Sequence, residues 1–304
     1  MNRNTLKKWA ENPWKVAISF SRRGWLNWLP DKAYLSLIYR ASFKKRINWK
    51  EPKTFNEKLQ WLKLFDRNPA YCEMVDKYEA KEFAFARIGG EYIVPVLGGP
   101  WDSFEEIDFS VLPNQFVLKT THDCGGVFIC KDKQSVDLEA AQAFLQRHLQ
   151  RNYYLTCREW PYKNVKPRIF AEEYLSALED DLKDYKFFCF NGVPRLMFIA
   201  SERQSKESET KFDFYDMDFN HLPIINGHPN ADQAPNKPQN FERMKELAAA
   251  LSAGIPHVRV DFYECHGRLY LGELTFSHWG GLVPFEPSEW DDILGSWIKL
   301  PGSE

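Results

Sequence analysis

Lys119 and the glycine pair Gly125-Gly126 have residue types and a spacing that could bind phosphate. The lysine ends the apolar run 116–118, and the glycines follow within seven residues and open a second apolar run. Glycines let the backbone approach phosphate closely, and a lysine ammonium supplies a point charge. The pattern suits a nucleoside triphosphate. No GxxxxGK[ST] motif is present, so this is not a Walker loop, and an exposed lysine before an ordinary turn is the alternative.

Four polar residues alternate along the apolar segment 257–276. If two antiparallel strands form here, Arg259 and Asp261 share a face of the first strand, and Glu273 and Thr275 share a face of the second. Two carboxylates that face each other in apolar surroundings repel unless a cation lies between them. Oxygen ligands of this kind suit Mg²⁺ that bridges ATP phosphates. A solvated sheet face is the alternative.

An acidic strand end at residues 170–175 precedes a run, 184–192, that begins with Asp-x-Lys. A carboxylate at such a position can take ribose hydroxyls while neighbouring backbone groups read a base. This arrangement is compatible with a hinge beside an adenine, whereas these residues taken alone indicate a polar strand edge.

The cysteines and histidines indicate neither a zinc site nor a disulfide framework. The six cysteines are scattered without CxxC spacing, and the seven histidines include no HExxH motif. We therefore expect reduced cysteines that mostly pack, and carboxylates as the ligands of any metal.

Helices and antiparallel strands must position these residues. Thr54 and Glu57 form a capping box ahead of an apolar stripe, which predicts a helix that ends at Pro69. A single second helix is predicted over 71–90, because helices commonly stop on residues able to adopt positive φ, here a glycine pair.

The rest of the chain alternates strands with helices, which is typical of the α+β fold class. Residues 203–240 are polar and rich in Pro, Asn and Asp apart from FDFYDMDF, and they predict a long mobile connection. The other expected elements are strands at 91–98, 114–120, 125–132 and 168–175, hairpins at 184–203 (turning at Asn-Gly) and 257–276, helices at 137–152, 240–254 and 288–300, and a loop at 277–287.

Charge is distributed unevenly along the 304 residues. Residues 1–50 carry 12 Lys/Arg and two Asp/Glu, about +10, whereas the remainder carries about −12. Six of the eleven Trp also fall within the first 61 residues. These features predict a basic, aromatic extension of short helices that docks on anionic phospholipid or on an anionic glycan. No nucleic-acid-binding motif accompanies the charge, so we expect no nucleic acid partner.

The composition indicates a folded protein of the cytoplasm. Apolar residues make up 44% and aromatic residues 15%, which excludes a disordered or fibrous chain. No run approaches the roughly 18 to 20 apolar residues that span a bilayer, and the polar start lacks the apolar region of a signal peptide. We expect a cytoplasmic protein with peripheral contact at the inner face of the membrane.

The order of these patterns is more specific than any one of them. A strand ending in Lys, a Gly-Gly turn, a Glu-Glu-Tyr-Leu strand, an Asp-x-Lys hairpin and a last hairpin with Arg-x-Asp and Glu-x-Thr resemble the ATP-grasp ligases. The segments PKTFNEKLQWLKLFDRNP, VDKYEAK, FVLKTTHDCGG, DYKFFCFNG and VRVDFYECHGRLYLGELTF resemble the TupA-like ATP-grasp family, associated with teichuronopeptide and other bacterial surface-polysaccharide synthesis. The resemblance covers about residues 48–300.

This resemblance implies an ATP-grasp fold, in which two α+β subdomains clasp ATP, with a helical, basic N-terminal extension. The implied parts are the extension at 1–50, a helical part at 51–90, a first subdomain with the Lys and Gly-Gly loop at 91–175, and a second subdomain with the metal and substrate site at 176–304.

The resemblance also implies roles in binding ATP. Lys119 corresponds to the lysine on the α- and β-phosphates, and Gly125 and Gly126 to the loop that covers phosphate. The other implied contacts are Glu172, Glu173, Tyr174 and Leu175 at the adenine hinge, Asp184 on the ribose, and Lys186 and Arg203 on phosphates.

For the metal, Asp261 and Glu273 correspond to the two Mg²⁺-binding acids, with Mn²⁺ as the alternative ion. Arg259 corresponds to the arginine that stabilises the charged intermediate. Thr275 departs from the pattern, because ligases of the D-Ala:D-Ala type have Asn there and a hydroxyl is a poorer ligand than an amide oxygen. A second metal would then need Ser277 or a water instead.

The loop after this hairpin supplies the candidate substrate contacts, His278, Trp279, Gly280 and Gly281. An aromatic side chain beside a glycine pair suits stacking on a sugar, and a packing role for Trp279 is the alternative.

The predicted function is an ATP- and Mg²⁺-dependent ligase that joins an amino acid to a uronic-acid-containing glycan or its lipid-linked precursor. The expected partners are those two substrates and, through residues 1–50, the membrane or glycan-assembly enzymes. The alternatives are a phosphotransferase that acts on a glycan, and a non-catalytic nucleotide-binding accessory protein of glycan assembly.

Overall fold

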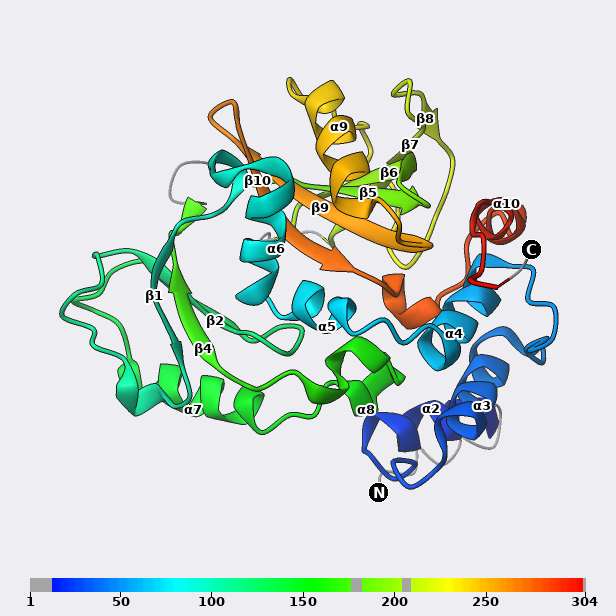
Figure 1. The fold of residues 1–304 in the computed structure, drawn as a ribbon, viewed down its shortest axis with the longest axis horizontal. Coiled ribbons are helices and arrows are strands. Elements are labelled where there is room, and N and C mark those ends of the chain that lie inside the picture. Colours follow the sequence, from blue (N-terminus) through cyan, green and yellow to red (C-terminus); the bar gives the residue numbers. More distant parts are fainter. Residues whose placement is uncertain (1–12, 176–181, 204–208, 303–304) are drawn as a thin grey trace.

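The computed structural model describes residues 13–175, 182–203 and 209–302, and it is built on two antiparallel sheets (Figure 1). The smaller sheet has the strand order β1-β4-β2-β3. Helix α7 (Leu138–Leu149) covers it by packing Ala141 and Leu145 against the fully buried Phe116. The strands are β1 (Val96–Trp101), β2 (Phe116–Thr120), β3 (Val127–Cys130) and β4 (Ile169–Glu172).

The larger sheet has the strand order β10-β9-β5-β6-β7-β8. The strands are β5 (Asp184–Phe190), β6 (Val193–Ser201), β7 (Lys211–Tyr215), β8 (His221–Leu222), β9 (His257–Cys265) and β10 (Arg268–Thr275). Asn191 and Gly192 have φ of 50° and 83° at the first hairpin turn, and His266 and Gly267 have 49° and 74° at the second. Two successive residues with positive φ match the twist of the flanking strands. Both predicted hairpins and the α+β class are confirmed.

Helices cover both faces of the larger sheet, so β5 is buried along its whole length. On one face, α9 (Phe241–Ser252) packs Phe241 and Met244 against the strands. On the other face, α4 (Phe55–Phe65) and α10 (Glu289–Trp297) contribute Phe55 and Leu294. The short helices are η1 (Gly90–Tyr92), η2 (Phe104–Glu106), α8 (Tyr154–Cys157), η3 (Trp160–Asn164) and η5 (His278–Gly281).

The capping box at the start of α4 is confirmed. Thr54 Oγ1 accepts the N–H of Glu57 at 3.3 Å, and Glu57 Oε2 accepts the N–H of Thr54 at 3.4 Å. These two bonds satisfy amide groups that the first turn of a helix leaves without partners.

The single helix predicted over 71–90 is wrong, because the chain forms α5 (Ala70–Val75) and α6 (Glu79–Ile88) instead. Asp76 is extended at φ −69° and ψ 114°, and its Oδ1 accepts the N–H groups of Tyr78 (2.9 Å) and Glu79 (3.1 Å). The side chain thus competes with helical hydrogen bonding and starts a new helix. The break points Lys77 towards the space between the sheets. α6 ends at Gly89 as predicted.

The long connection predicted over 203–240 is also wrong for residues 209–240. β7 and β8 extend the larger sheet, because the run FDFYDMDF supplies alternating apolar residues that the sheet can bury. Phe212 and Phe214 pack with Phe198, and Asn230 Nδ2 donates to Phe212 O at 2.7 Å. Polar composition concealed these long-range contacts. Residues 204–208 lie outside the described residues.

The N-terminal part forms two helices, α2 (Pro13–Arg22) and α3 (Asp31–Phe43), and residues 1–12 of the predicted extension lie outside the described residues. Tyr34 and Ile38 of α3 pack with Leu282, which directly follows η5. Tyr34 Oη donates to the backbone oxygen of Thr156 at 2.8 Å. Within the described residues, no helix has the length and apolar character needed to cross a bilayer.

Candidate active site

A cavity of about 500 Å³ takes its wall from both sheets. β2 and β4 contribute from the smaller sheet, and β5, β6, β7, β9 and β10 from the larger one. Its cationic side chains, within the described residues, are Lys77, Lys81, Lys119, Lys186, Arg203 and Arg259. Its acidic side chains are Asp123, Glu159, Glu172 and Glu273. The surplus of cations suits a polyanionic ligand.

Lys119 lines the cavity together with Lys81, and the two share one buried carboxylate. Glu172 forms ion pairs with Lys119 and, at 3.0 Å, with Lys81. Burial raises the pKa of the Glu172 carboxyl, but the two ammonium groups outweigh burial and lower it. No role was predicted for Lys81. The feature that could have indicated one is the spacing in VDKYEAK, which puts Lys77 and Lys81 four residues apart.

Contacts of the neighbouring Asp123 fix the conformation of the Gly125-Gly126 turn. Asp123 accepts from Thr120 Oγ1 and pairs with His148, while its backbone oxygen accepts from Lys77. A Cβ on Gly126 would lie 1.8 Å from Thr120 Oγ1, so only glycine fits there. Neither glycine is part of the described cavity wall. The turn is fixed in shape, and its predicted contact with phosphate stays a prediction.

The four predicted hinge residues have different surroundings. Glu172 faces the cavity, whereas Glu173 is exposed and donates its backbone N–H to Pro95 O at 3.0 Å. Tyr174 and Leu175 are buried, and Leu175 packs in a small apolar cluster. Backbone groups of this segment could still read a base, which is what the prediction requires.

Asp184 lies behind the cavity wall, paired with two cations. It is 1% exposed, and its Oδ2 lies 3.1 Å from Lys186 Nζ and also contacts Arg203. Lys186 makes a second ion pair, with Asp261. The predicted contact of Asp184 with ribose therefore requires these ion pairs to open, whereas Lys186 and Arg203 already face the cavity.

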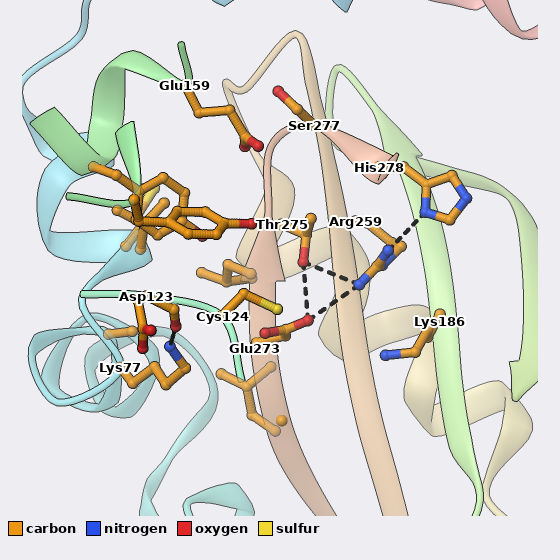
Figure 2. A pocket seen from close by; sticks show the side chains of 18 of the residues that line it. Lys77, Asp123, Cys124, Glu159, Lys186, Arg259, Glu273, Thr275, Ser277 and His278 are labelled. Atoms are coloured by element: carbon orange, nitrogen blue, oxygen red, sulfur yellow. Dashed lines mark hydrogen bonds and ion pairs between the residues drawn. The ribbon is translucent and has the colours of Figure 1, made fainter. Parts of the chain in front are cut away.

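Arg259 lies at the centre of the polar residues predicted on the hairpin at 257–276 (Figure 2). The strand register pairs Asp261 with Glu273 and Arg259 with Thr275. The guanidinium donates to both oxygens of Asp261, each at 2.7 Å, and to Glu273 Oε1 and Thr275 Oγ1, each at 3.1 Å. The cation expected between the two carboxylates is thus present as Arg259.

The electrostatics of this cluster favour its charged form. Burial raises the pKa of the Asp261 carboxyl, but Arg259 and Lys186 outweigh burial and hold the pKa well below its usual range. Burial likewise lowers the pKa of Arg259, and Asp261 and Glu273 more than restore it. The half-exposed Glu273 is the member of the cluster most open to a ligand.

His278 is a neutral support for Arg259. Arg259 donates to His278 Nδ1 at 2.7 Å, so this nitrogen is unprotonated and Nε2–H donates to Asn226 Oδ1 at 2.8 Å. Burial and the charge of Arg259 hold the pKa of His278 well below its usual value. The sequence analysis missed Asn226, because that residue lies in the segment interpreted as a mobile connection.

The rest of the predicted substrate loop is partly structural. Gly280 and Gly281 both have φ of 62°, and their carbonyl oxygens accept from Gln60 Nε2 at 3.1 and 2.8 Å. Lys63 Nζ also donates to Gly280 O at 2.5 Å. Gly280 and the half-exposed Trp279 line the cavity, whereas Gly281 packs against α4.

Four cavity residues come from a segment that carries no functional signal in the sequence. They lie on the connection between α7 and β4, around α8 and η3, and are Tyr153, Cys157, Glu159 and Tyr162. No motif or periodicity distinguishes this segment, so only the structure reveals that it forms part of the wall.

Of the two predicted metal ligands, Glu273 faces the cavity, whereas Asp261 is buried and both of its oxygens are paired with Arg259 or Lys186. Among the residues that the structure describes, no three His, Cys, Asp or Glu side chains cluster closely enough to hold a metal ion alone. Nucleotide sites commonly bind Mg²⁺ through one or two carboxylates together with phosphate oxygens. Glu273 provides one such carboxylate, and Asp261 could provide a second only when its pairs with Arg259 and Lys186 open.

Two antiparallel sheets around a cation-rich cavity, with Arg-x-Asp and Glu-x-Thr on a facing hairpin, define an ATP-grasp protein. A sequence model described as TupA-like ATPgrasp matches residues 57–299. Because this match covers most of the chain, the protein belongs to the TupA-like ATP-grasp family. The predicted family and fold are confirmed. A comparison with curated protein sequences finds no match.

Several solved structures are similar at low identity. D-alanine–D-alanine ligase from Bacillus anthracis in complex with ATP has 15% identity and a TM-score of 0.38, over 67% of this chain and 53% of that one. L-amino acid ligase from Bacillus licheniformis has 13% identity and a TM-score of 0.48, over 89% and 62%. D-cycloserine synthetase has 16% identity and a TM-score of 0.41, over 92% and 81%. The match thus spans 53% and 62% of the two ligases.

Proposed function

We propose that this protein is an ATP- and Mg²⁺-dependent carboxylate-amine ligase that works through an acyl phosphate. The observation that carries the proposal is the position of Arg259, between Asp261 and Glu273 in a cavity also lined by four lysines and Arg203. Such a site stabilises the negative charge that develops during phosphoryl and acyl transfer. Membership of an ATP-grasp family supports the same conclusion.

The chemistry then needs positioning and charge more than a covalent nucleophile. A carboxylate oxygen of one substrate attacks the γ-phosphorus of ATP, and ADP leaves. The amine of the second substrate attacks the acyl carbon, the C–N bond forms, the bond to phosphate breaks, and the amine loses a proton. Lys81 and Lys119 bind the α- and β-phosphates, and Lys186 and Arg203 bind the transferred group.

Arg259 stabilises the oxyanion that forms when the amine adds, and His278 fixes the orientation of the guanidinium. Glu273, together with Asp261 once its pairs with Arg259 and Lys186 open, would hold Mg²⁺ or Mn²⁺, and that ion would neutralise charge on the triphosphate. Thr275 donates to Glu273 Oε1 at 3.2 Å, so it orients that carboxylate even if it is not itself a ligand.

We further propose that the substrates are an amino acid and a uronic-acid-containing surface glycan or its precursor. The support is the resemblance to a family associated with surface-polysaccharide synthesis, together with a cavity of about 500 Å³ that Trp279 lines as a candidate sugar platform.

The decisive experiment measures ADP release with Mg²⁺ and ATP while amino acids are crossed with uronic-acid glycans. A ligase releases ADP and phosphate in equal amounts, and full turnover requires both the carboxylate and the amine. ADP release with a phosphorylated sugar and no amine requirement would favour a phosphotransferase. No turnover with any pair, despite nucleotide binding, would favour the accessory protein.

The residues of the predicted metal site lead to a prediction about thermal stability. Mg²⁺ alone should leave the melting temperature within about 1 °C, because the protein offers only Asp261 and Glu273 and Arg259 already pairs with both. Mg²⁺ with a non-hydrolysable ATP analogue at 100 times its Kd should raise it by about 5 °C. Thermal shift measures both, with AMP and Mg²⁺ as the control. An equal rise in melting temperature with Mg²⁺ alone would contradict the proposal that Mg²⁺ binds together with the nucleotide.

For the N-terminal extension we propose docking on an anionic phospholipid membrane. Residues 13–50 carry nine Lys/Arg and one Asp, and Trp25 and Trp28 are 55% and 77% exposed. Beside them lies an apolar hollow lined by Trp14, Phe20 and Leu26. Exposed Trp with surrounding Lys and Arg suits the charged interface of a bilayer. Contact between α3 and Leu282 would place the substrate loop near that membrane.

Co-sedimentation with vesicles tests this docking. The exposed Arg22 and Arg23 should each contribute about 1 kcal/mol, so changing both to Gln should weaken binding to phosphatidylglycerol-containing vesicles about 30-fold. The matched control changes the exposed Lys131 and Arg147 to Gln and should have little effect. Equal binding of all three proteins, or equal binding to purely zwitterionic vesicles, would refute the proposal.

A further inference from the structure

Glu159 is an acidic side chain in the cavity wall to which the steps above give no role. It follows α8 and is only 5% exposed. Figure 2 shows it near Ser277, with Lys77 and Asp123 in another part of the cavity. Burial raises the pKa of its carboxyl, and Lys63 and Ser277 offset that rise in part. The cavity thus contains a buried acid that lies in a different part of the wall from Lys77 and Asp123.

The charge of Glu159 is not met by a direct ion pair. Lys63, the cation that acts on it most strongly, donates to Gly280 O at 2.5 Å and to Gln60 Oε1 at 3.1 Å instead. Among the described side chains, no cation forms a salt bridge with Glu159. A buried carboxylate is costly unless a cation or hydrogen-bond donors meet it. The cavity side of Glu159 is therefore suited to a cationic group of a ligand.

The neighbours of Glu159 fit the same kind of ligand. Tyr153 and Tyr162 also line the cavity, with ring centroids 4.7 Å apart in an edge-on arrangement. Tyr162 donates its backbone N–H to Glu159 O at 3.1 Å, so the two residues are neighbours in the cavity wall. Burial raises the pKa of both phenols, and the charge of Glu159 raises it further. Aromatic faces next to an acid suit an ammonium group and its aliphatic stem.

We propose that Glu159 binds the amino group of the nucleophilic substrate as an ammonium ion and then accepts one of its protons, which frees the nitrogen lone pair to attack the acyl carbon, with Tyr153 and Tyr162 packed against the amine. The inference rests on the proposed ligase function and specifies the substrate class as a primary amine that enters the cavity charged. Arg259 lines the same cavity as Glu159, so the bound amine would share that cavity with the arginine that stabilises acyl transfer.

Hydroxylamine provides the test, because it is an uncharged nucleophile at neutral pH and traps an acyl phosphate as a hydroxamate. Glu159→Gln should raise the KM for the amino acid about 30- to 1000-fold, the cost of removing one partner of a buried charge pair. The same variant should form hydroxamate from hydroxylamine, ATP and the carboxylate substrate within about threefold of the wild-type rate. Glu159→Asp should recover part of the amino acid KM.

The hydroxylamine reaction also reports whether the variant is folded. Glu139→Gln, the same chemical change at an exposed position on α7, is the matched control and should leave both reactions unchanged. Equal loss of both reactions in Glu159→Gln, or an unchanged amino acid KM, would overturn the role of Glu159 alone. If the wild-type protein forms no hydroxamate with any carboxylate of the panel, the ligase function fails, and this inference fails with it.

Discussion

The Asp261→Asn variant is expected to lose both stability and ATP turnover. Asp261 is 1% exposed and pairs with Arg259 and Lys186, so an amide removes the buried counter-charge that these two cations share. Removing one partner of a buried ion pair costs about 3–5 kcal/mol. Loss of a group that positions charge at the reacting centre costs about 100- to 1000-fold in rate. Urea unfolding at pH 7 and ADP release measure the two effects.

Glu273→Gln separates catalysis from folding in the same cluster. The Glu273 side chain is 43% exposed, and its contact with Arg259 is a single hydrogen bond at 3.1 Å. Pairs this exposed contribute about 0–1 kcal/mol, so the variant should unfold close to the wild-type urea midpoint. Its ADP release should nevertheless fall about 100-fold or more. Full activity in Glu273→Gln would sink the ligase proposal.

The same carboxylate predicts a dependence of stability on acid. Because the folded pKa of Asp261 lies below its ordinary value of 3.8, the unfolded chain binds more protons in the interval between the two values. The stabilisation is therefore complete above pH 3.8 and is lost as pH falls through the folded pKa. Wild type should lose stability more steeply than Asp261→Asn below about pH 4. Parallel acid unfolding curves would show that the ion pair does not stabilise the fold.

Local patterns in the sequence were sufficient to predict the hairpin that bears this cluster. Alternation of polar and apolar residues fixes which side chains share a face, and a turn with two positive φ values fixes the register to within a bulge. Asp261 therefore lies opposite Glu273 as expected. What alternation could not reveal is that Arg259 already fills the space between the acids, because side-chain hydrogen bonds depend on geometry in three dimensions.

Residues from irregular segments escaped the sequence analysis for a related reason. Lys77 faces the cavity because Asp76 interrupts a helix, and Asn226 supports His278 from a polar segment that resembles a linker. Glu159 lies between two short helices with no periodic signal. Each of these positions is determined by contacts with residues distant in sequence, which propensity and periodicity do not encode.

Lys119→Ala is expected to lower kcat/KM for ATP about 100- to 1000-fold. Lys119 and Lys81 together carry two positive charges against the single charge of Glu172, so a triphosphate meets a net positive group. Without Lys119, the remaining Lys81 and Glu172 neutralise each other. The fall in kcat/KM for ATP should therefore be larger than the fall caused by removing one distant charge. ADP release at varied ATP concentration measures the effect, and Lys131→Ala, at an exposed position outside the cavity wall, is the control.

A second substitution distinguishes this charge balance from simple loss of a contact. In Lys119→Ala with Glu172→Gln, Lys81 regains an uncompensated charge that faces the cavity, so kcat/KM for ATP should recover about tenfold. If Lys119 acts only by direct contact, adding Glu172→Gln should give no recovery of kcat/KM for ATP and should lower it further. Recovery of kcat/KM without a rise in melting temperature relative to Lys119→Ala would tie the effect to electrostatics and not to a gain in stability.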